Sequence, residues 1–572
     1  MRKLFFFIKP MANRYIGFLM FLFVYTMIMQ RCGGLPSVLT NWRLEIPLLL
    51  YLYYYFNLIT RKSRLQCLLA GVPVLLVYGI FDFYYLQLGG VLRLIEVTEL
   101  PELFLVMPFG AKIFIGLLLG MPIIAFLLSV QLCRFRQLLL GTLPLLAILV
   151  AVERYPEFFM AAFEGTHKKI DWMSDAESLR SNGRVSMALY NEARRKSCLK
   201  KTAAYRGDSF FKRTFDDTVV KVRTLRTKHN VHLIVLESFI DPNLFREAHF
   251  SRNPIHPSFD SFFKGKGGFS VSPVFGGATA QAEFEILSGV PAMQELSGIE
   301  FNVFTGAKTL CLPNLLAQGG FHTVATNAFL PDFFNSLNAY EGMGFERIFF
   351  PRDYAPRRET YFSTGDVTGE RYMFDGNLFT QNLAFVAKWF KENPGRPMFN
   401  YIIGIYGHTP HDINTEKRPK VVKMLGKVRD YQLERAVNQC YYRTKAIASF
   451  VKELIRIDPK SIIILVSDHL PPLTYGPNTY RDLNYLGKSQ NYIHMNRIYI
   501  VENGQPVHYD TIHHYDIPRL ILSYVTQAKY DHKVAAKTNF RNVGFSITDF
   551  HEQYMAIMAN AMNEEPLFSP IE

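Results

Sequence analysis

Cysteine is scarce in this sequence, and the spacing that cysteine chemistry needs is missing. The chain of 572 residues contains 6 cysteines, and no two of them form a C-x-x-C pair. Zinc ribbons and dithiol redox centres are therefore excluded. Only Cys198, Cys311 and Cys440 lie after residue 152, so that part of the chain can form one disulfide at most. It must be stabilised by its own hydrophobic core.

Acidic residues are also in deficit. The chain has 49 Asp and Glu against 63 Lys and Arg, a net charge of +14. A basic excess is typical of nucleic-acid-binding proteins and of proteins that contact anionic lipid. The first 152 residues are far more apolar than the rest, which favours lipid and predicts no nucleic-acid partner. The stretch "KGKGG" (264–268) lacks the remainder of a Walker motif, so we interpret it as a turn.

Five long apolar runs occupy the first quarter of the chain. They lie at about residues 11–30, 44–60, 65–87, 111–132 and 137–152. A membrane-spanning helix needs about 20 apolar residues, with a range of 17–25. The third and fourth runs meet this length, while the second and fifth are marginal. Because the runs follow one another across short charged loops, we predict a five-helix transmembrane domain over residues 1–152.

Positive charge predicts how these helices are oriented. The N-terminus carries Arg2, Lys3, Lys9 and Arg14, and the loop after the second run reads "RKSR" (61–64). Intervening loops are poorer in Lys and Arg, so the positive-inside rule places the N-terminus in the cytoplasm. Five spans then place everything after residue 152 outside. Asp82, within the third run, is costly in lipid and is expected to face other helices or the interface.

Residues 153–228 form a charged connector with amphipathic stretches such as "RVSMALYNEARR" (184–195). Such a pattern is typical of helices that lie along a membrane surface. It fits an ordinary solvated linker equally well, and both interpretations stay open.

From residue 229 the pattern becomes that of a C-terminal α/β domain over 229–572. Apolar, β-branched runs that end in polar residues occur at 231–237, 321–327, 398–408 and 461–469. Runs of this kind predict strands buried on both faces of a parallel sheet. Helical patterns lie between them, which indicates a doubly wound fold with its ligand beyond the carboxyl ends of the strands.

Chemically active residues follow these strand ends. One strand ends in Glu237, another in Asp468 and His469, and "IYGH" supplies His408. The stretch "FGGAT" adds Thr279 at the start of a predicted helix. Carboxylates, an imidazole and a hydroxyl together suit a divalent metal, which would lower the pKa of the threonine hydroxyl and make it a nucleophile.

Each of these residues also has an ordinary structural interpretation. Thr279 on its own is typical of a helix cap. Glu283 and Glu285 are expected to be acidic residues that favour a helix start rather than a second catalytic pair. Glu237 could cap a helix or pair with an arginine, and His408 could be a loop histidine. The order and placement of the residues along the chain favour the metal site.

This order resembles the alkaline phosphatase/sulfatase superfamily, and in particular the lipoteichoic acid synthase-like membrane phosphoglycerol transferases. The matching stretches are "LIVLESFIDP", "SPVFGGATAQAEFEILSGVP", "LPNLLAQGGFHTV", "IIGIYGHTPH" and "ILVSDHLPP". The resemblance implies a sulfatase-like fold for residues 229–572. It implies that one divalent ion, manganese with zinc or magnesium as alternatives, binds to Glu237, Thr279, Asp468 and His469. Thr279 would be the nucleophile, and His408 would contact the phosphate and could protonate the leaving group.

The sequence departs from that family where the phosphoglycerol group is held. A histidine, a tryptophan and an arginine of the family align with Asn327, Phe334 and Ser336 here. These three residues and His408 are the expected substrate-binding positions. Loss of the arginine removes a bidentate phosphate contact and puts the identity of the headgroup in question.

The expected function is transfer of a phosphoglycerol headgroup from phosphatidylglycerol, through a phosphothreonine intermediate, to a glycan or lipid-glycan acceptor. The expected location is the bacterial inner membrane, with an extracytoplasmic or periplasmic catalytic domain. A phosphoethanolamine transferase using phosphatidylethanolamine, and a metal-dependent phosphatase, are alternatives. True sulfatase activity is disfavoured because threonine cannot become formylglycine. A sensor or assembly protein with a degenerate site is the alternative outside enzymes.

Overall fold

The computed structural model describes residues 2–35, 43–99, 101, 104–105, 109–131, 135–166, 170, 175–205, 210–426, 429–489, 491–528 and 547–563. It divides into two compact units. The first comprises Met1–Lys201 with Glu295–Gly298, and the second comprises Thr202–Gln294 with Ile299–Glu572. The division falls inside the stretch predicted as a connector. Residues 529–546 and 564–572 of the predicted catalytic domain lie outside the described residues.

All five apolar runs are helical in the first unit. The helices are α1 (Arg2–Arg31), α2 (Glu45–Ile59), α3 (Gln66–Leu88), α5 (Phe109–Ser129) and α6 (Phe135–Arg154). Three of them are long and apolar enough to cross a membrane: α3, the Lys112–Ser129 part of α5, and α6. Helix α2, with 15 residues, is shorter than a span requires, and α1 does not meet the same criterion over its described residues. The structure therefore supports three of the five predicted spans and a membrane protein.

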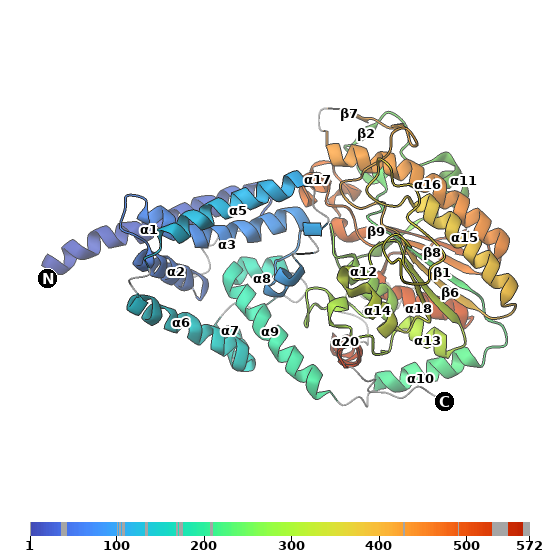
Figure 1. The fold of residues 1–572 in the computed structure, drawn as a ribbon, viewed down its shortest axis with the longest axis horizontal. Helices are drawn as coiled ribbons and strands as arrows, with labels where there is room; N and C mark the ends of the chain where they lie inside the picture. Colours follow the sequence, from blue (N-terminus) through green and yellow to red (C-terminus); the bar gives the residue numbers. More distant parts are fainter. Residues whose placement is uncertain are drawn as a thin grey trace. The chain divides into compact units, whose positions relative to one another are not determined.

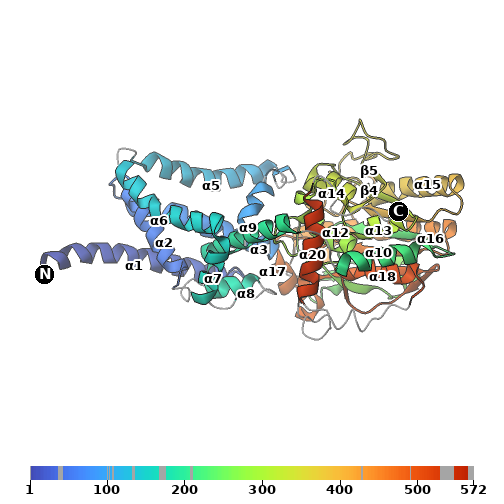
Figure 2. The ribbon, with the colours of Figure 1, turned by 90° about the horizontal axis from the view of Figure 1, so that it is seen from below.

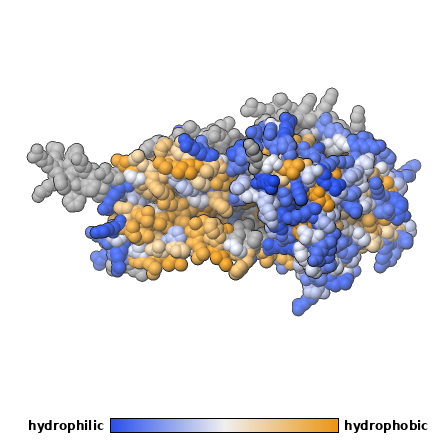
Figure 3. Space-filling view, turned by 90° about the horizontal axis from the view of Figure 1, so that it is seen from above, coloured by the Kyte–Doolittle hydropathy of each residue, from blue (hydrophilic) through white to orange (hydrophobic). Residues whose placement is uncertain are grey.

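Apolar side chains cover much of the surface that the first unit presents in Figure 3. Leu128, Leu140 and Phe114, on α5 and α6, are among the exposed large apolar residues of this unit. A large exposed apolar surface is unfavourable in water and favourable in hydrocarbon. The surface is thus consistent with the three candidate spans.

Asp82 faces other parts of the protein, as predicted. It pairs with Arg184 at 2.7 Å, and both side chains are buried. Arg184 begins α9 (Arg184–Ala204), which follows α7 (Pro156–Thr166) and α8 (Asp175–Asn182). The Glu45 carboxylate accepts hydrogen bonds from the backbone N–H groups of Arg184, Val185 and Ser186. A negative charge at a helix N-terminus satisfies donors that the helix leaves unpaired, so Glu45 anchors the start of α9.

A mixed β-sheet forms the centre of the second unit. Among the described residues its strands run in the order β11-β3-β9-β8-β1-β6-β4-β5, with β10 paired to β9. Their bounds are β1 Val231–Leu236, β3 Gly268–Val271, β4 His322–Asn327, β5 Arg347–Phe349, β6 Met398–Ile403, β8 Ile462–Ser467, β9 Met495–Glu502, β10 Gln505–Val507 and β11 Ile512–His513. A separate short pair joins β2 (His249–Phe250) to β7 (Met424–Leu425).

The four predicted strands are confirmed as the parallel centre of this sheet. Strands β8, β1, β6 and β4 are neighbours, and all pair in parallel. The other side of the sheet was not predicted, because β9 runs antiparallel to both β8 and β3. These strands are partly exposed or short, so they lack the continuous apolar pattern that reveals a buried parallel strand.

Helices cover both faces of the sheet (Figures 1 and 2). Helices α11 (Pro257–Phe263), α15 (Asp375–Glu392) and α16 (Tyr431–Ile457) pack together on one face. Side chains such as Phe379 and Val451 meet Ile234 and Ile402 there in one apolar core. The other face carries α10 (Phe210–Arg223), α12 (Thr279–Ser288), α13 (Leu312–Gln318), α14 (Ser336–Met343) and α18 (Ile517–Val525). Two further helices of this unit are α17 (Pro477–Asp482) and α20 (Ile547–Ala561). This is the predicted doubly wound arrangement.

Parallel pairing brings the chemically active residues to one edge. Leu236, the last residue of β1, is in register with Ser467, the last residue of β8. Glu237 and Asp468 are the next residues of the two strands, so they must leave the sheet side by side. The turn after β6, the other neighbour of β1, leads to His408.

Candidate metal and nucleophile site

Three of the predicted metal ligands form one cluster. Glu237, Asp468 and His469 each offer a ligand atom, and these atoms all lie within 4.8 Å of one another. His469 Nε2 lies 3.3 Å from Asp468 Oδ2 and 3.9 Å from Glu237 Oε1. All three side chains are buried. Two carboxylates and an imidazole at this spacing can hold one divalent ion.

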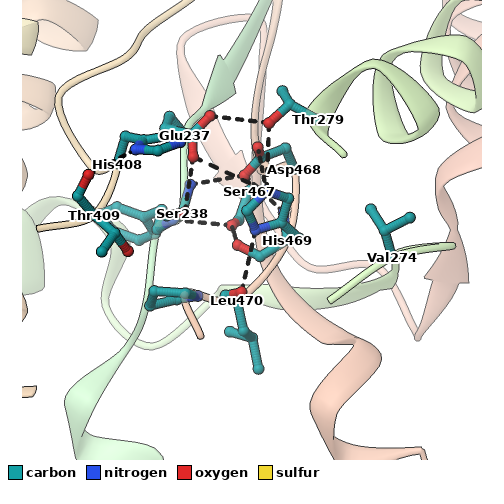
Figure 4. Close-up of polar contacts among 12 residues, drawn as sticks. Glu237, Ser238, Val274, Thr279, His408, Thr409, Ser467, Asp468, His469 and Leu470 are labelled. Carbon is teal, nitrogen blue, oxygen red and sulfur yellow. Dashed lines mark hydrogen bonds and ion pairs between the residues drawn. The ribbon is translucent and has the colours of Figure 1, made fainter. Parts of the chain in front are cut away.

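Hydrogen bonds from the protein orient these side chains and leave ligand atoms available (Figure 4). The Ser238 and His469 backbone N–H groups donate to Asp468 Oδ1 at 2.7 and 2.6 Å. Asp468 Oδ2 is buried and accepts no hydrogen bond from the described residues. His469 Nδ1 contacts the Leu470 carbonyl oxygen at 3.1 Å, so this nitrogen carries the proton and Nε2 keeps its lone pair. The unsatisfied carboxylate oxygen and the imidazole lone pair fit a metal ion.

Burial and charge repulsion make this cluster unfavourable without a cation. Burial raises the pKa of Asp468 to about 7, and the nearby Glu237 carboxylate adds to the increase. A buried pair of carboxylates is stabilised when a positive charge neutralises it. The electrostatics therefore point in the same direction as the geometry.

Thr279 belongs to the same cluster. Its hydroxyl donates to Glu237 Oε2 at 3.1 Å and lies 3.3 Å from His469 Nε2. The residue begins α12, but the capping position is Ala278, and no side chain caps that end. Thr279 therefore does not serve as a helix cap, and its oxygen lies among the predicted metal ligands; its role as nucleophile stays a prediction.

The turn before Thr279 explains the glycines that precede it. Gly276 has φ of +75° and Ala278 has φ of +59°. Alanine in this left-handed conformation costs free energy of about 1–2 kcal/mol. A Cβ atom on Gly277 would meet nothing within 4 Å. The turn aims Thr279 at the ligands and keeps its other side open, which suits a group that a substrate must approach.

His408 lies beside this cluster, next to Glu237 in Figure 4. Its Nδ1 contacts the Thr409 carbonyl oxygen at 2.8 Å, which places the proton on Nδ1 and leaves Nε2 as the nitrogen that can accept one. Burial lowers the pKa of His408 to about 4. In the metal-free protein this imidazole is neutral at pH 7, so it is better suited to accept a proton first than to donate one.

The other predicted substrate-binding residues are Asn327, Ser336 and Phe334, and the polar groups of the first two form hydrogen bonds within the protein. Asn327 is buried, donates to the Tyr340 hydroxyl at 3.0 Å and accepts from the Phe329 N–H at 2.8 Å. The Ser336 hydroxyl donates to the Phe333 carbonyl oxygen at 2.6 Å. Hence the polar groups of both residues are already engaged within the protein.

Phe334 is half-buried, and its backbone has φ of +51°. Its ring centroid lies 4.3 Å from that of Phe333. The aromatic surface expected at this position is present, while its contact with a headgroup stays a prediction.

Glu283 shows a part of the site that the sequence did not reveal. Together with Glu285 it was expected to favour the helix start by its charge, but both side chains are buried. The Tyr340 and Tyr401 hydroxyls donate to Glu283 Oε1 at 2.6 and 2.5 Å. Burial raises the pKa of Glu283 to about 7. This network ties the second turn of α12 to β6 and α14, and so positions the helix that carries Thr279.

His514 is a second supporting residue that sequence reasoning missed. Its Nε2 lies 3.1 Å from the Asp468 carbonyl oxygen, and its Nδ1 lies 2.6 Å from the Ser270 hydroxyl. The pair "HH" at 513–514 was the one available signal, but nothing in a single sequence shows which strand end it meets.

Comparison with known proteins identifies the family. The sulfatase family model matches residues 229–527, which is more than half of the chain. The chain belongs to the sulfatase family. Its second unit thus has the fold of the alkaline phosphatase superfamily, whose members are metal-dependent.

Individual relatives are distant. The chain is 25% identical, over 258 residues, to a Rhizobium meliloti protein named "Putative cyclic beta-1,2-glucan modification protein"; the match covers 44% of this chain and 37% of that protein. The chain spans little more than a third of the length of the curated relatives that it matches, 34% and 37%.

Two solved structures are similar. Streptococcus pyogenes phosphoglycerol transferase GacH, in complex with sn-glycerol-1-phosphate, is 16% identical with a TM-score of 0.46, over 63% of this chain and 92% of GacH. Lipoteichoic acid synthase LtaP from Listeria monocytogenes is 18% identical with a TM-score of 0.43, over 57% of this chain and 81% of LtaP.

Proposed function

We propose that this protein is a membrane-anchored, metal-dependent transferase. It would move a phosphoglycerol headgroup from phosphatidylglycerol through a phosphothreonine intermediate on Thr279 to an extracytoplasmic glycan. The observation that carries this proposal is the position of the Thr279 hydroxyl, 3.1 Å from Glu237 and 3.3 Å from His469 instead of capping its helix. The name of the Rhizobium relative supports a glycan as the acceptor.

The reaction would proceed in two displacements. In the first, Thr279 Oγ1 forms a bond to the headgroup phosphorus, the bond from phosphorus to the diacylglycerol oxygen breaks, and diacylglycerol leaves with a proton. In the second, an acceptor hydroxyl oxygen attacks the same phosphorus, the bond to Thr279 breaks and the threonine regains its proton. Two displacements through an enzyme intermediate replace one difficult step.

The residues of the site have distinct roles in this scheme. Glu237, Asp468 and His469 would hold the divalent ion, with Thr279 as a fourth ligand, and manganese is the ion we propose. When bound, such an ion lowers the pKa of a coordinated hydroxyl and stabilises charge on phosphate oxygens. His408, through Nε2, would take the proton of Thr279 and pass it to the leaving diacylglycerol oxygen in the first step. In the second step it would take the proton of the acceptor hydroxyl and return it to Thr279.

The donor is tested directly. Purified full-length protein in nanodiscs is incubated with manganese and with labelled phosphatidylglycerol or phosphatidylethanolamine, and diacylglycerol release and the mass of the Thr279 peptide are measured. We expect release from phosphatidylglycerol and a phosphoglycerol mass on Thr279. Release from phosphatidylethanolamine alone would keep the mechanism and replace the donor with the ethanolamine lipid, and release of free headgroup phosphate to water would identify a hydrolase.

Topology is tested separately. We propose a bacterial inner-membrane protein with a cytoplasmic N-terminus and an extracytoplasmic catalytic unit. A reporter fused at residue 200 should be active only outside the cytoplasm. A cytoplasmic reporter signal would overturn the lipid-to-glycan reaction, because both substrates would then lie on the wrong side.

A further inference from the structure

A buried carboxylate fixes the chain segment next to His408. Glu370 accepts hydrogen bonds from the Tyr406 hydroxyl at 2.7 Å, the Asn414 N–H at 3.1 Å and Arg418 Nε at 2.9 Å. Tyr406 and Asn414 lie on either side of His408 in sequence. The two residues that follow Glu370, Arg371 and Tyr372, are therefore held firmly beside that histidine.

The hydroxyl of Tyr372, whose ring packs beside His408, has no hydrogen-bond partner among the described residues. Its ring centroid lies 5.3 Å from that of His408, at an interplanar angle of 64°. The residue is 4% exposed, and its hydroxyl makes no hydrogen bond with any of the described residues. Leaving a buried hydroxyl unsatisfied costs about 1–3 kcal/mol, which the protein recovers if a ligand binds it.

Arg371 brings a positive charge to the same place. Its guanidinium carbon lies 5.5 Å from the centroid of the Tyr372 ring. The charge acts on both neighbours of that ring. Burial raises the pKa of Tyr354, and the Arg371 charge partly offsets this increase; burial lowers the pKa of His408, and the Arg371 charge adds a small decrease. The Phe329 ring packs against both tyrosines: its centroid lies 5.8 Å from that of Tyr354 and 5.9 Å from that of Tyr372.

The charge balance of the site calls for such a cation. The Glu237 and Asp468 carboxylates cancel the two charges of a divalent ion, and His408 is neutral. A lipid phosphodiester adds one negative charge, and Ser336 stands where the family has an arginine. An arginine fork makes charge-assisted hydrogen bonds to phosphate oxygens that neutral donors cannot match.

We infer that Arg371 and the Tyr372 hydroxyl bind the phosphate of the transferred group beside His408, and that Glu370 is the residue that positions them. Arg371 thereby supplies the cationic contact that Ser336 does not. The inference rests on the proposed function for the identity of the substrate, but the anion site itself does not depend on which lipid or acceptor is used.

The test separates the anion site from turnover. Full-length Thr279→Ala protein, loaded with manganese, is titrated calorimetrically with inorganic phosphate and with glycerol phosphate, so that no reaction can occur. Arg371→Gln and Tyr372→Phe are added to this background. Arg357→Ala, at an exposed arginine of the neighbouring loop, and Tyr475→Phe, at an exposed tyrosine, are matched controls.

We expect Arg371→Gln to raise the dissociation constant for both probes by about tenfold or more, and Tyr372→Phe by about three- to tenfold, while the controls change neither. Arg371→Lys should recover part of the affinity. Unchanged affinity in Arg371→Gln protein that keeps its manganese and its melting temperature would overturn the inference, as would failure of the parent protein to bind either probe.

The same variants, made in protein that keeps Thr279 and can therefore react, then test the proposed function. If phosphate binding depends on Arg371 but no lipid releases diacylglycerol, the anion site stands and the donor proposal falls. If lipid is turned over and Arg371→Gln leaves the KM for the donor unchanged, the donor proposal stands and the anion site falls.

Discussion

The predicted metal ligands and the predicted headgroup-binding residues use their polar atoms in opposite ways. Glu237, Asp468 and His469 are buried with ligand atoms within 4.8 Å of one another, and Asp468 Oδ2 accepts no hydrogen bond from the described residues. On the headgroup side, Asn327 and Ser336 direct their polar atoms to a tyrosine hydroxyl and to backbone groups. Unsatisfied polar atoms inside a protein point to a missing ligand, whereas satisfied ones point to structure.

This difference explains why a family pattern can persist on one side of a site and change on the other. Metal binding requires particular ligand atoms at particular distances, so those residues tolerate little change. A headgroup can be held from several directions. Here we place its phosphate contact on the loop that carries Arg371 instead of at Ser336.

The largest effect on activity is expected from a substitution of Thr279. Thr279→Ala should lower transfer by about 10³-fold or more, because the reacting oxygen is lost. The free energy of unfolding should change by about 0.5 kcal/mol or less, because the hydroxyl is not part of the core. Diacylglycerol release and thermal melting measure both, with Thr380→Ala on the exposed face of α15 as control. Substantial turnover by Thr279→Ala would exclude the covalent intermediate.

Removing one metal ligand is the next largest change. Asp468→Asn or His469→Ala should abolish bound manganese and transfer together, since each removes a ligand that the buried cluster cannot replace. Elemental analysis of the purified protein measures the metal, and His508→Ala at an exposed histidine is the control. Full activity of either variant after exhaustive chelation would make the site structural instead of catalytic.

A pH titration sharpens the same side of the comparison. The pKa of Asp468 is raised to about 7, so in the metal-free protein the carboxyl is protonated below pH 7 and charged above it. Metal must displace that proton, and manganese affinity should therefore fall about tenfold per unit as the pH drops below 7, and level off above it. Calorimetric metal titrations between pH 5.5 and 8.5 test this, and a flat profile would contradict it.

The smallest effect on activity is expected on the headgroup side. Asn327→Ala should destabilise the fold by about 1–3 kcal/mol, because it leaves the Phe329 N–H and the Tyr340 hydroxyl with fewer partners. At a temperature where the variant is folded, the KM for the lipid donor should stay within about twofold of the wild-type value. The reason is that the Asn327 side chain forms its hydrogen bonds within the protein. Denaturant unfolding and donor kinetics test this, with exposed Asn243→Ala as control. A raised KM with unchanged stability would show that Asn327 contacts the substrate, as the sequence suggested.

The centre of the sheet in the second unit could be predicted from the sequence. Strands β1, β4, β6 and β8 were predicted because each is a continuous apolar run, and such a run has no stable place except a sheet covered on both faces. Their parallel pairing then required Glu237 and Asp468 to meet at one edge. The family pattern predicted Thr279 beside them, and in the structure its hydroxyl lies 3.1 Å from Glu237 Oε2.

Three features needed the tertiary structure. Whether Thr279 caps α12 or faces Glu237 depends on the left-handed turn at Ala278 and on what lies opposite, neither of which is encoded in local propensity. Glu283 is buried because Tyr340 and Tyr401, 57 and 118 residues away in sequence, supply its hydrogen bonds. Arg371 lies against Tyr372, the neighbour of His408, and Glu370 ties their loop to the segment around that histidine. The sequence by itself determined which strands are buried and which residues leave them, because burial is a property of each segment. The tertiary structure decided which polar groups are satisfied by the protein and which remain for a ligand, because hydrogen-bond partners come from distant parts of the chain.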